Sequence, residues 1–141
     1  MNNSILNLKF SHNWNERSHR GDKSRRTGKL DCLCFSTIRL DTPQYEVGQV
    51  VRVLLENKTR VDEVMGYARI QVKNVFERDR LTDGVAYLDT GYNRSAVLGI
   101  LGKMYPTAQP TTKMCFLILK YLTEEEIKEF SLQTQLSLVH N

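Results

Sequence analysis

Two hydroxyl groups and a guanidinium group lie within four residues of one another, at Ser36, Thr37 and Arg39. A guanidinium group is a planar donor fork that suits a phosphate or the edge of a base, and a hydroxyl group acts as a nucleophile when a base takes its proton. In an extended strand Thr37 and Arg39 point to one face, whereas Ile38 and Leu40 point to the other. The spacing therefore predicts a short strand with one face for the core and one face for a ligand.

Four further strands are expected to hold this one in place. Alternating or continuous apolar residues mark them at 5–10, 47–55, 64–75 and 114–119. The two long strands, 47–55 and 64–75, are expected to pair as a hairpin. The last run is apolar on both faces, which is typical of an enclosed central strand.

Three helices are predicted from their capping residues. Thr82 is an N-cap candidate for a short helix, and Asn93 begins a second one that ends near Met104. Thr123 with Glu126 forms a capping box, which opens a third helix. The residues after 130 either extend this helix or form a loose tail.

The order of these pieces resembles that of the ASCH domain, a branch of the PUA-like β-barrels. The matching pieces are the strand at 35–40, the strand at 66–72, the short helix at 81–86, and the helix end at 104–106 with the strand at 114–119. The resemblance covers roughly residues 30 to 122 and implies an α+β fold. That fold is a small β-barrel with two or three short helices packed against it.

One branch of the ASCH family consists of small amidohydrolases that act on N4-acetylcytidine. Their machinery is a Lys three residues before the Thr of the Thr-Ile-Arg strand, that Thr, and a Glu in the helix after the second long strand. The corresponding positions here are Cys34, Thr37 and a position near Asp89. Because a Thr hydroxyl needs a base, and Cys34 is not one, we expect the chain to be non-catalytic. The alternative is an amidohydrolase of modified nucleosides that uses Thr37 and Asp89.

The resemblance implies a binding cleft in either case, because PUA-like folds recognise RNA or modified bases beside the barrel. Ser36, Thr37 and Arg39 would donate to the ligand, and Asp89 would accept from an exocyclic amine. Another interpretation is that Arg39 pairs with Asp89 or Asp83 as a structural bridge across the mouth of the cleft.

An aromatic and polar group precedes this strand at 11–15, where the only Trp of the chain, Trp14, stands two residues after His12. Such a set can stack a base and read its edge. The alternative, weighed equally, is that Trp14 plugs one end of the barrel while His12 caps a turn. Lys9, at the end of the first strand, is a candidate contact for the nucleic-acid backbone.

The positive charge is concentrated in residues 16–29, which hold six basic and two acidic residues and so account for the whole net charge of +4. Apart from His19, the rest of this stretch is Gly, Ser and Thr, with no apolar residue to bury, which predicts a flexible basic loop. Arg25 and Arg26 are its candidate contacts with RNA phosphates. A solvated surface loop is the alternative.

No metal ion and no cofactor is expected. His12, His19 and His140 lack ligand spacing, and the three cysteines, Cys32, Cys34 and Cys115, are expected to be reduced structural thiols. No apolar run approaches the length of a membrane span, and the first residues do not read as a signal peptide. We therefore expect a cytoplasmic protein with no membrane partner.

The 141 residues, of which 40% are hydrophobic, fit one domain with decorated ends. We expect an N-terminal strand and turn at 1–15, the basic insertion at 16–29, the ASCH-like core at 30–122 and a C-terminal helix and tail at 123–141. The leading hypothesis is a module that binds RNA or a nucleotide. Besides the amidohydrolase, a protein-interaction module that docks a partner on the C-terminal helix and tail is the second alternative.

Overall fold

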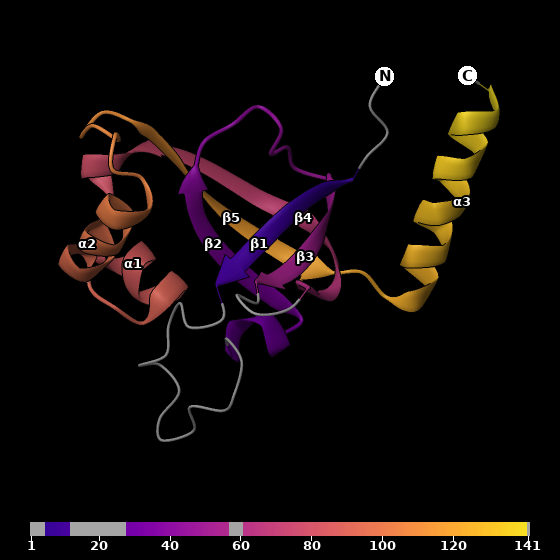
Figure 1. The fold of residues 1–141 in the computed structure, drawn as a ribbon, viewed down its shortest axis with the longest axis horizontal. Coiled ribbons are helices and arrows are strands. Elements are labelled where there is room, and N and C mark those ends of the chain that lie inside the picture. The colour runs from indigo at the N-terminus through magenta and orange to yellow at the C-terminus, as the bar shows by residue number, and fades with distance from the viewer. Residues whose placement is uncertain (1–4, 12–27, 57–60, 141) are drawn as a thin grey trace.

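The computed structural model describes residues 5–11, 28–56 and 61–140. His12, Trp14, Arg25 and Arg26, and with them the predicted basic loop up to residue 27, lie outside the described residues. Figure 1 shows the elements of the fold in space. In chain order they are β1 (Leu6–Ser11), the 3₁₀ helix η2 (Gly28–Asp31), β2 (Cys34–Leu40), β3 (Val50–Glu56), β4 (Glu63–Glu77), the 3₁₀ helix η3 (Arg78–Arg80), α1 (Asp83–Thr90), α2 (Arg94–Met104), β5 (Lys113–Tyr121) and α3 (Glu124–His140).

The five strands form one curled sheet in the order β1-β3-β4-β5-β2. β1 runs parallel to β3, and the other neighbours are antiparallel. β1 and β2 are the two edge strands, so the sheet is an open half-barrel within the described residues rather than a closed ring. The expected barrel is therefore confirmed only as a small, barrel-like α+β fold.

The predicted hairpin is confirmed, because β3 and β4 pair antiparallel from Val50 opposite Arg69 to Leu55 opposite Glu63. The register shifts once in this ladder and once between β4 and β5. Such shifts bend a strand and increase its twist, which helps a five-stranded sheet to curl. The prediction of an enclosed strand at 114–119 also holds, since β5 lies between β4 and β2.

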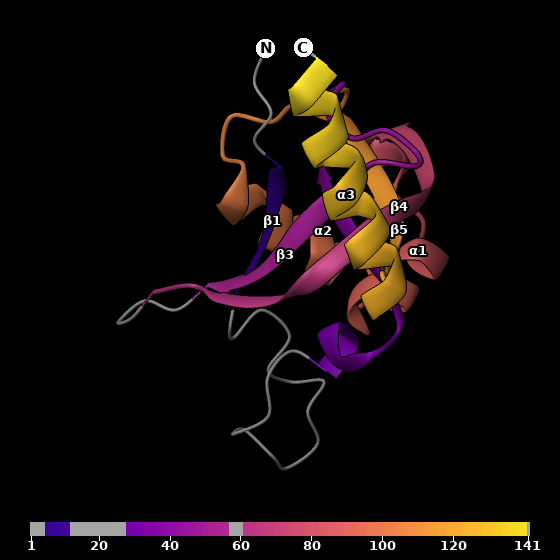
Figure 2. The same ribbon diagram turned by 90° about the vertical axis from the view of Figure 1, so that its right-hand side faces the viewer.

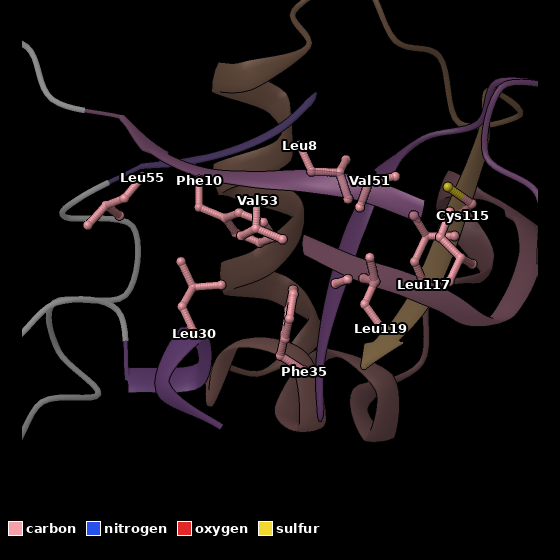
Figure 3. Close-up of a cluster of buried hydrophobic side chains, with 12 residues drawn as sticks. Leu8, Phe10, Leu30, Phe35, Val51, Val53, Leu55, Cys115, Leu117 and Leu119 are labelled. Carbon is pink, nitrogen blue, oxygen red and sulfur yellow. The ribbon is translucent and has the colours of Figure 1, made fainter. Parts of the chain in front are cut away.

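The main core fills the concave side of the half-barrel and draws on all five strands and on η2. In Figure 3, Leu8 and Phe10 of β1 lie on one side of this core, and Phe35 of β2 and Leu119 of β5 lie on the other. Leu30 of η2 lies next to Phe10 and Phe35. Both edge strands thus contribute to one core, which keeps β1 and β2 near each other without a backbone ladder between them.

A second core lies between the sheet and the helices α1 and α2, which cover the same side of the molecule (Figure 1). The Thr82 hydroxyl accepts from the Val85 backbone N–H, and the Asn93 side chain accepts from the Ala96 N–H. Both predicted N-caps are therefore confirmed. Ile38 of β2 packs into this second core, so both faces of β2 are covered and not only one.

The helix α3 lies on the opposite side of the molecule from α1 and α2 (Figures 1 and 2). Its capping box is confirmed, because the Thr123 N–H donates to Glu126 Oε1 at 3.1 Å and the Glu126 N–H donates to Thr123 Oγ1 at 3.1 Å. The helix continues to His140, which decides between the two interpretations of the C-terminal residues. None of the helices in the described part of the chain is long and apolar enough to cross a membrane.

Candidate functional site

A pocket of about 360 Å³ lies where the two edge strands face the C-terminal end of α2. We call it the seam pocket, because β1 and β2 are the strands between which the half-barrel is open (Figure 1). It is lined by Lys9, Phe10, Thr37, Ile38, Arg39, Glu56, Ile100, Lys103, Met104 and Tyr105. Three of the predicted site residues, Lys9, Thr37 and Arg39, therefore meet here.

Arg39 is the central side chain of the seam pocket and joins the two edge strands. Its Nε donates to Thr37 Oγ1 at 3.2 Å, as expected for side chains on the same face of β2. Its Nη2 crosses to β1 and donates to the Lys9 carbonyl oxygen at 2.6 Å. The guanidinium carbon lies 4.7 Å from the centroid of the Phe10 ring, within the range of a cation–π contact. These contacts fix the orientation of the guanidinium group.

Arg39 has no carboxylate within ion-pair distance among the described residues, so the predicted bridge to Asp89 or Asp83 is wrong. Asp89 pairs with Lys29 instead, at 3.3 Å. Asp83 Oδ1 accepts from the Arg94 backbone N–H at 2.8 Å. Both acids are committed elsewhere, so Arg39 forms no ion pair with either of them.

The other charged side chains of the seam pocket differ in how they are paired. Lys9 lies 3.3 Å from Asp62. Lys103 of α2 and Glu56 at the end of β3 are exposed, and neither forms an ion pair with any described residue. Judged against the described residues alone, the pocket therefore presents two cations, Arg39 and Lys103, and one carboxylate, Glu56, that form no ion pair. Its α2 side adds apolar and aromatic surface from Ile100, Met104 and Tyr105.

A second polar group lies beside the seam pocket, where η2, β2 and α1 meet. We call it the Lys29 cluster, and its members are Lys29, Ser36 and Asp89. Asp89 Oδ1 accepts from Ser36 Oγ at 2.7 Å and from Lys29 Nζ at 3.3 Å, while Lys29 Nζ also lies 3.4 Å from the Asp89 carbonyl oxygen. Asp89 is only 4% exposed, and its Oδ2 is buried with no hydrogen-bond partner among the described residues.

Burial lowers the pKa of the Lys29 amine below its ordinary value of 10.5, because the charged form loses solvation. The negative charge of Asp89 and the hydrogen bond to it oppose this shift, and the nearby positive charge of Arg39 adds to it. The Lys29 Nζ lies 5.6 Å from the centroid of Phe10, the ring that Arg39 also contacts. The cluster and the seam pocket therefore share one aromatic side chain.

The predicted site is thus divided between two places. Thr37 and Arg39 line the seam pocket, whereas Ser36, one position away on a strand, points to the opposite face and reaches Asp89. Asp89 does not line the seam pocket, contrary to its expected role as an acceptor in the cleft. The predicted contributions of His12, Trp14, Arg25 and Arg26 lie outside the described residues.

The three cysteines are free in the structure, as the expectation of reduced thiols requires, and one of them, Cys115, has the expected place in the core. Cys115 is buried in the main core, and burial raises its pKa to about 11, so it stays protonated. Cys32 and Cys34 are exposed, and only Cys34 belongs to β2, of which it is the first residue. An amine does come close to Asp89, but it comes from Lys29 and not from position 34.

Sequence reasoning missed Lys29, Glu56 and Lys103 as site residues. Lys29 was grouped with the basic loop, although the apolar Leu30 that follows it marks a segment that returns to the core. Lys103 and Glu56 carry no local signal, since Lys103 lies in the last turn of an ordinary helix and Glu56 is the last residue of an ordinary strand. Only the curl of the sheet brings them to the same pocket.

Two larger hollows are each lined by fewer charged side chains than the seam pocket. One of about 750 Å³ lies beside α3, and its only charged lining residue, Arg69, donates to the Gly48 carbonyl oxygen at 2.7 Å. The other, of about 680 Å³, has Glu46 as its only charged lining residue. Of these three hollows, all formed by described residues, the seam pocket is the one in which several charges converge.

Across the residues that the structure describes, no group of three or more His, Cys, Asp or Glu side chains is arranged to hold a metal ion. Compared with known proteins, the chain matches no family model, no curated protein and no solved structure. The site must therefore be interpreted from its own geometry.

Proposed function

We propose that the chain binds RNA or a free nucleotide in the seam pocket, without catalysis. The observation that carries this proposal is the state of Arg39. Its guanidinium group is half-buried and oriented by Thr37, the Lys9 carbonyl oxygen and the Phe10 ring. It has no carboxylate partner in the described part of the chain. A charge held in this way favours an anionic ligand, and phosphate matches the donor geometry of arginine.

The size and the lining of the pocket fit the same class of ligand. About 360 Å³ is within the range of small-molecule sites, which combine apolar walls with a few placed polar groups. The ring of Tyr105 and the side chain of Met104 supply surface on which a base can pack. Lys103, on the same helix, adds a second cation near the phosphate.

The resemblance to the ASCH domain also supports this proposal, because PUA-like folds recognise RNA or modified bases beside their barrel. The Thr-Ile-Arg strand that carries the resemblance, 37–39, is the part of β2 that lines the seam pocket. Two independent arguments, one from the order of motifs and one from the geometry, therefore favour the same place.

The test is a binding titration of fluorescein-labelled single-stranded RNA at two salt concentrations, with adenosine monophosphate as competitor. Lys103→Glu should weaken binding by about tenfold and should make the affinity less dependent on salt, because one phosphate contact is lost. Lys128→Glu, an equal change of charge on the exposed side of α3, is the matched control. Equal affinities for the two variants would place the ligand outside the seam pocket.

We infer a second candidate function, hydrolysis of N4-acetylcytidine, from the Lys29 cluster. Burial lowers the pKa of Lys29, so its amine loses a proton more readily than a free lysine does, and the deprotonated amine can take the proton of a hydroxyl nucleophile. Ser36 is the hydroxyl that shares Asp89 with this amine. In the reaction Ser36 Oγ bonds to the acetyl carbon as the amide C–N bond breaks, and the cytidine amine leaves with the proton that Lys29 took from Ser36. Water then cleaves the Ser36 acetyl ester, supplies the oxygen of the released acetate and returns a proton to Ser36.

This candidate predicts that purified protein releases acetate from N4-acetylcytidine, and that the rate rises with pH as Lys29 loses its proton, at a pH below the 10.5 of a free lysine. Ser36→Ala and Lys29→Met should each abolish the release. Thr37→Val, a hydroxyl removed from the opposite face of β2, is the control. If the wild-type chain releases no acetate at any pH, the Lys29 cluster has only a structural role.

A further inference from the structure

Glu56 is the one lining residue of the seam pocket whose charge does not suit a phosphate. It is the last residue of β3 and stands opposite Ser11 of β1, two positions beyond the residue that stands opposite Lys9. Its side chain is exposed, and no described cation lies within ion-pair distance of it. A carboxylate in this place would repel a bound phosphate.

The opposite charges of the seam pocket predict a ligand that carries both hydrogen-bond donors and hydrogen-bond acceptors. A carboxylate at neutral pH only accepts hydrogen bonds, so Glu56 requires donors from the ligand. Arg39 and Lys103 only donate, so they require acceptors. A nucleotide provides both, since its phosphate accepts, whereas its ribose hydroxyls and its base amines donate.

The elements that supply the lining residues indicate where the ribose and the base of a bound nucleotide would lie. Lys9, Arg39 and Glu56 come from the strands, while the apolar surface of Ile100 and Met104 comes from α2. In a nucleotide the sugar adjoins the phosphate and the base lies beyond it. A base that packs on α2 leaves the sugar next to the strand residues and thus beside Glu56.

We propose that Glu56 is a specificity-determining residue that accepts a hydrogen bond from the ribose 2′-hydroxyl, so that the seam pocket selects ribonucleotides over deoxyribonucleotides. Acidic side chains bind ribose hydroxyls in this way in dinucleotide-binding folds, and the 2′-hydroxyl is the group by which proteins tell RNA from DNA. This inference rests on the proposed nucleotide-binding function and adds the class of sugar.

The experiment compares adenosine 5′-monophosphate with 2′-deoxyadenosine 5′-monophosphate by isothermal titration calorimetry. The wild-type chain should prefer the ribonucleotide by about tenfold, the usual effect of one hydrogen bond to a charged group. Glu56→Ala should bring this ratio close to one. Glu46→Ala, which removes an exposed acid that lines the hollow of about 680 Å³, should leave the ratio unchanged.

The outcomes separate the two proposals. Failure of both nucleotides and of single-stranded RNA to bind would overturn the proposed function itself. Binding with equal affinity for the two sugars, or a ribose preference that survives in Glu56→Ala, would overturn only the role of Glu56. A Glu56→Ala variant that changes the preference between cytidine and uridine monophosphate, and not the ribose preference, would assign Glu56 to a base amine and would also overturn it.

Discussion

At the scale of single residues, the most consequential interaction is the pair of Lys29 and Asp89. Their side chains are 14% and 1% exposed, and the Ser36 hydroxyl binds the same carboxylate oxygen. Removing one partner of a buried pair leaves the other charge without compensation, which costs about 3 kcal/mol or more. We therefore expect Lys29→Met to lower the free energy of unfolding by about 3 kcal/mol, measured by urea denaturation.

The same reasoning predicts that a second change recovers most of this loss. In Lys29→Met/Asp89→Asn the buried carboxylate is replaced by a neutral amide that can still accept from Ser36. Lys113→Met is the matched control, because Lys113 is 61% exposed and its contact with Glu77 is 3.7 Å long. We expect that change to cost less than about 0.5 kcal/mol. A double variant as unstable as Lys29→Met would show that the pair is not what stabilises this region.

At the scale of the elements, the helices and strands are predictable from the sequence, because their signals come from residues close together in the chain. The side chains of Thr82, Asn93 and Thr123 cap the three helices, each by accepting a hydrogen bond from the backbone N–H three positions ahead. Each cap therefore depends on only a few neighbouring residues. The strands follow from their apolar pattern in the same way. Their two-residue period also placed Thr37 and Arg39 on one face.

What the sequence does not contain locally is which elements become neighbours. β1 pairs with β3 and not with β2, so the residues of β1 that adjoin the seam pocket cannot be read from β1 itself. Lys29 has many possible acidic partners along the chain, and only the approach of α1 to η2 selects Asp89. Arg39 likewise stands without the acid expected for it, because both candidates are bonded elsewhere. The candidate site was therefore predicted only in part. The sequence indicates the face of β2 that carries Thr37 and Arg39, but not which elements lie opposite that face.

At the scale of the whole molecule, the candidate site exists because the half-barrel does not close. A closed sheet would fill the space between β1 and β2 with a backbone ladder, whereas here side chains span it. The shared core holds the two edges near each other, and the seam pocket lies where α2 ends beside them. The open side of the described sheet thus provides the space of the seam pocket, and the proposed ligand would meet there the charges of Arg39, Lys103 and Glu56.

This architecture makes Arg39 a mechanical link between the two edges, in addition to the binding role proposed for it. Its hydrogen bond to the Lys9 carbonyl oxygen, 2.6 Å long, joins β2 to β1, whose backbone pairs with β3 and with no other described strand. We expect Arg39→Met to speed amide hydrogen exchange in β1 by about fivefold or more, the effect of losing one hydrogen bond of about 1 kcal/mol. Amides of the central strands β4 and β5 should keep their protection.

The matched control for this prediction is Arg52→Met. Arg52 also binds β1, through Asn7 Oδ1 at 2.9 Å, but it does so from β3, the strand to which β1 is already joined by a backbone ladder. Its loss should therefore change exchange in β1 much less than the loss of Arg39. If the two variants exchange alike, or if β1 is unaffected in Arg39→Met, the core alone holds the edges together. The role of Arg39 would then be confined to the ligand.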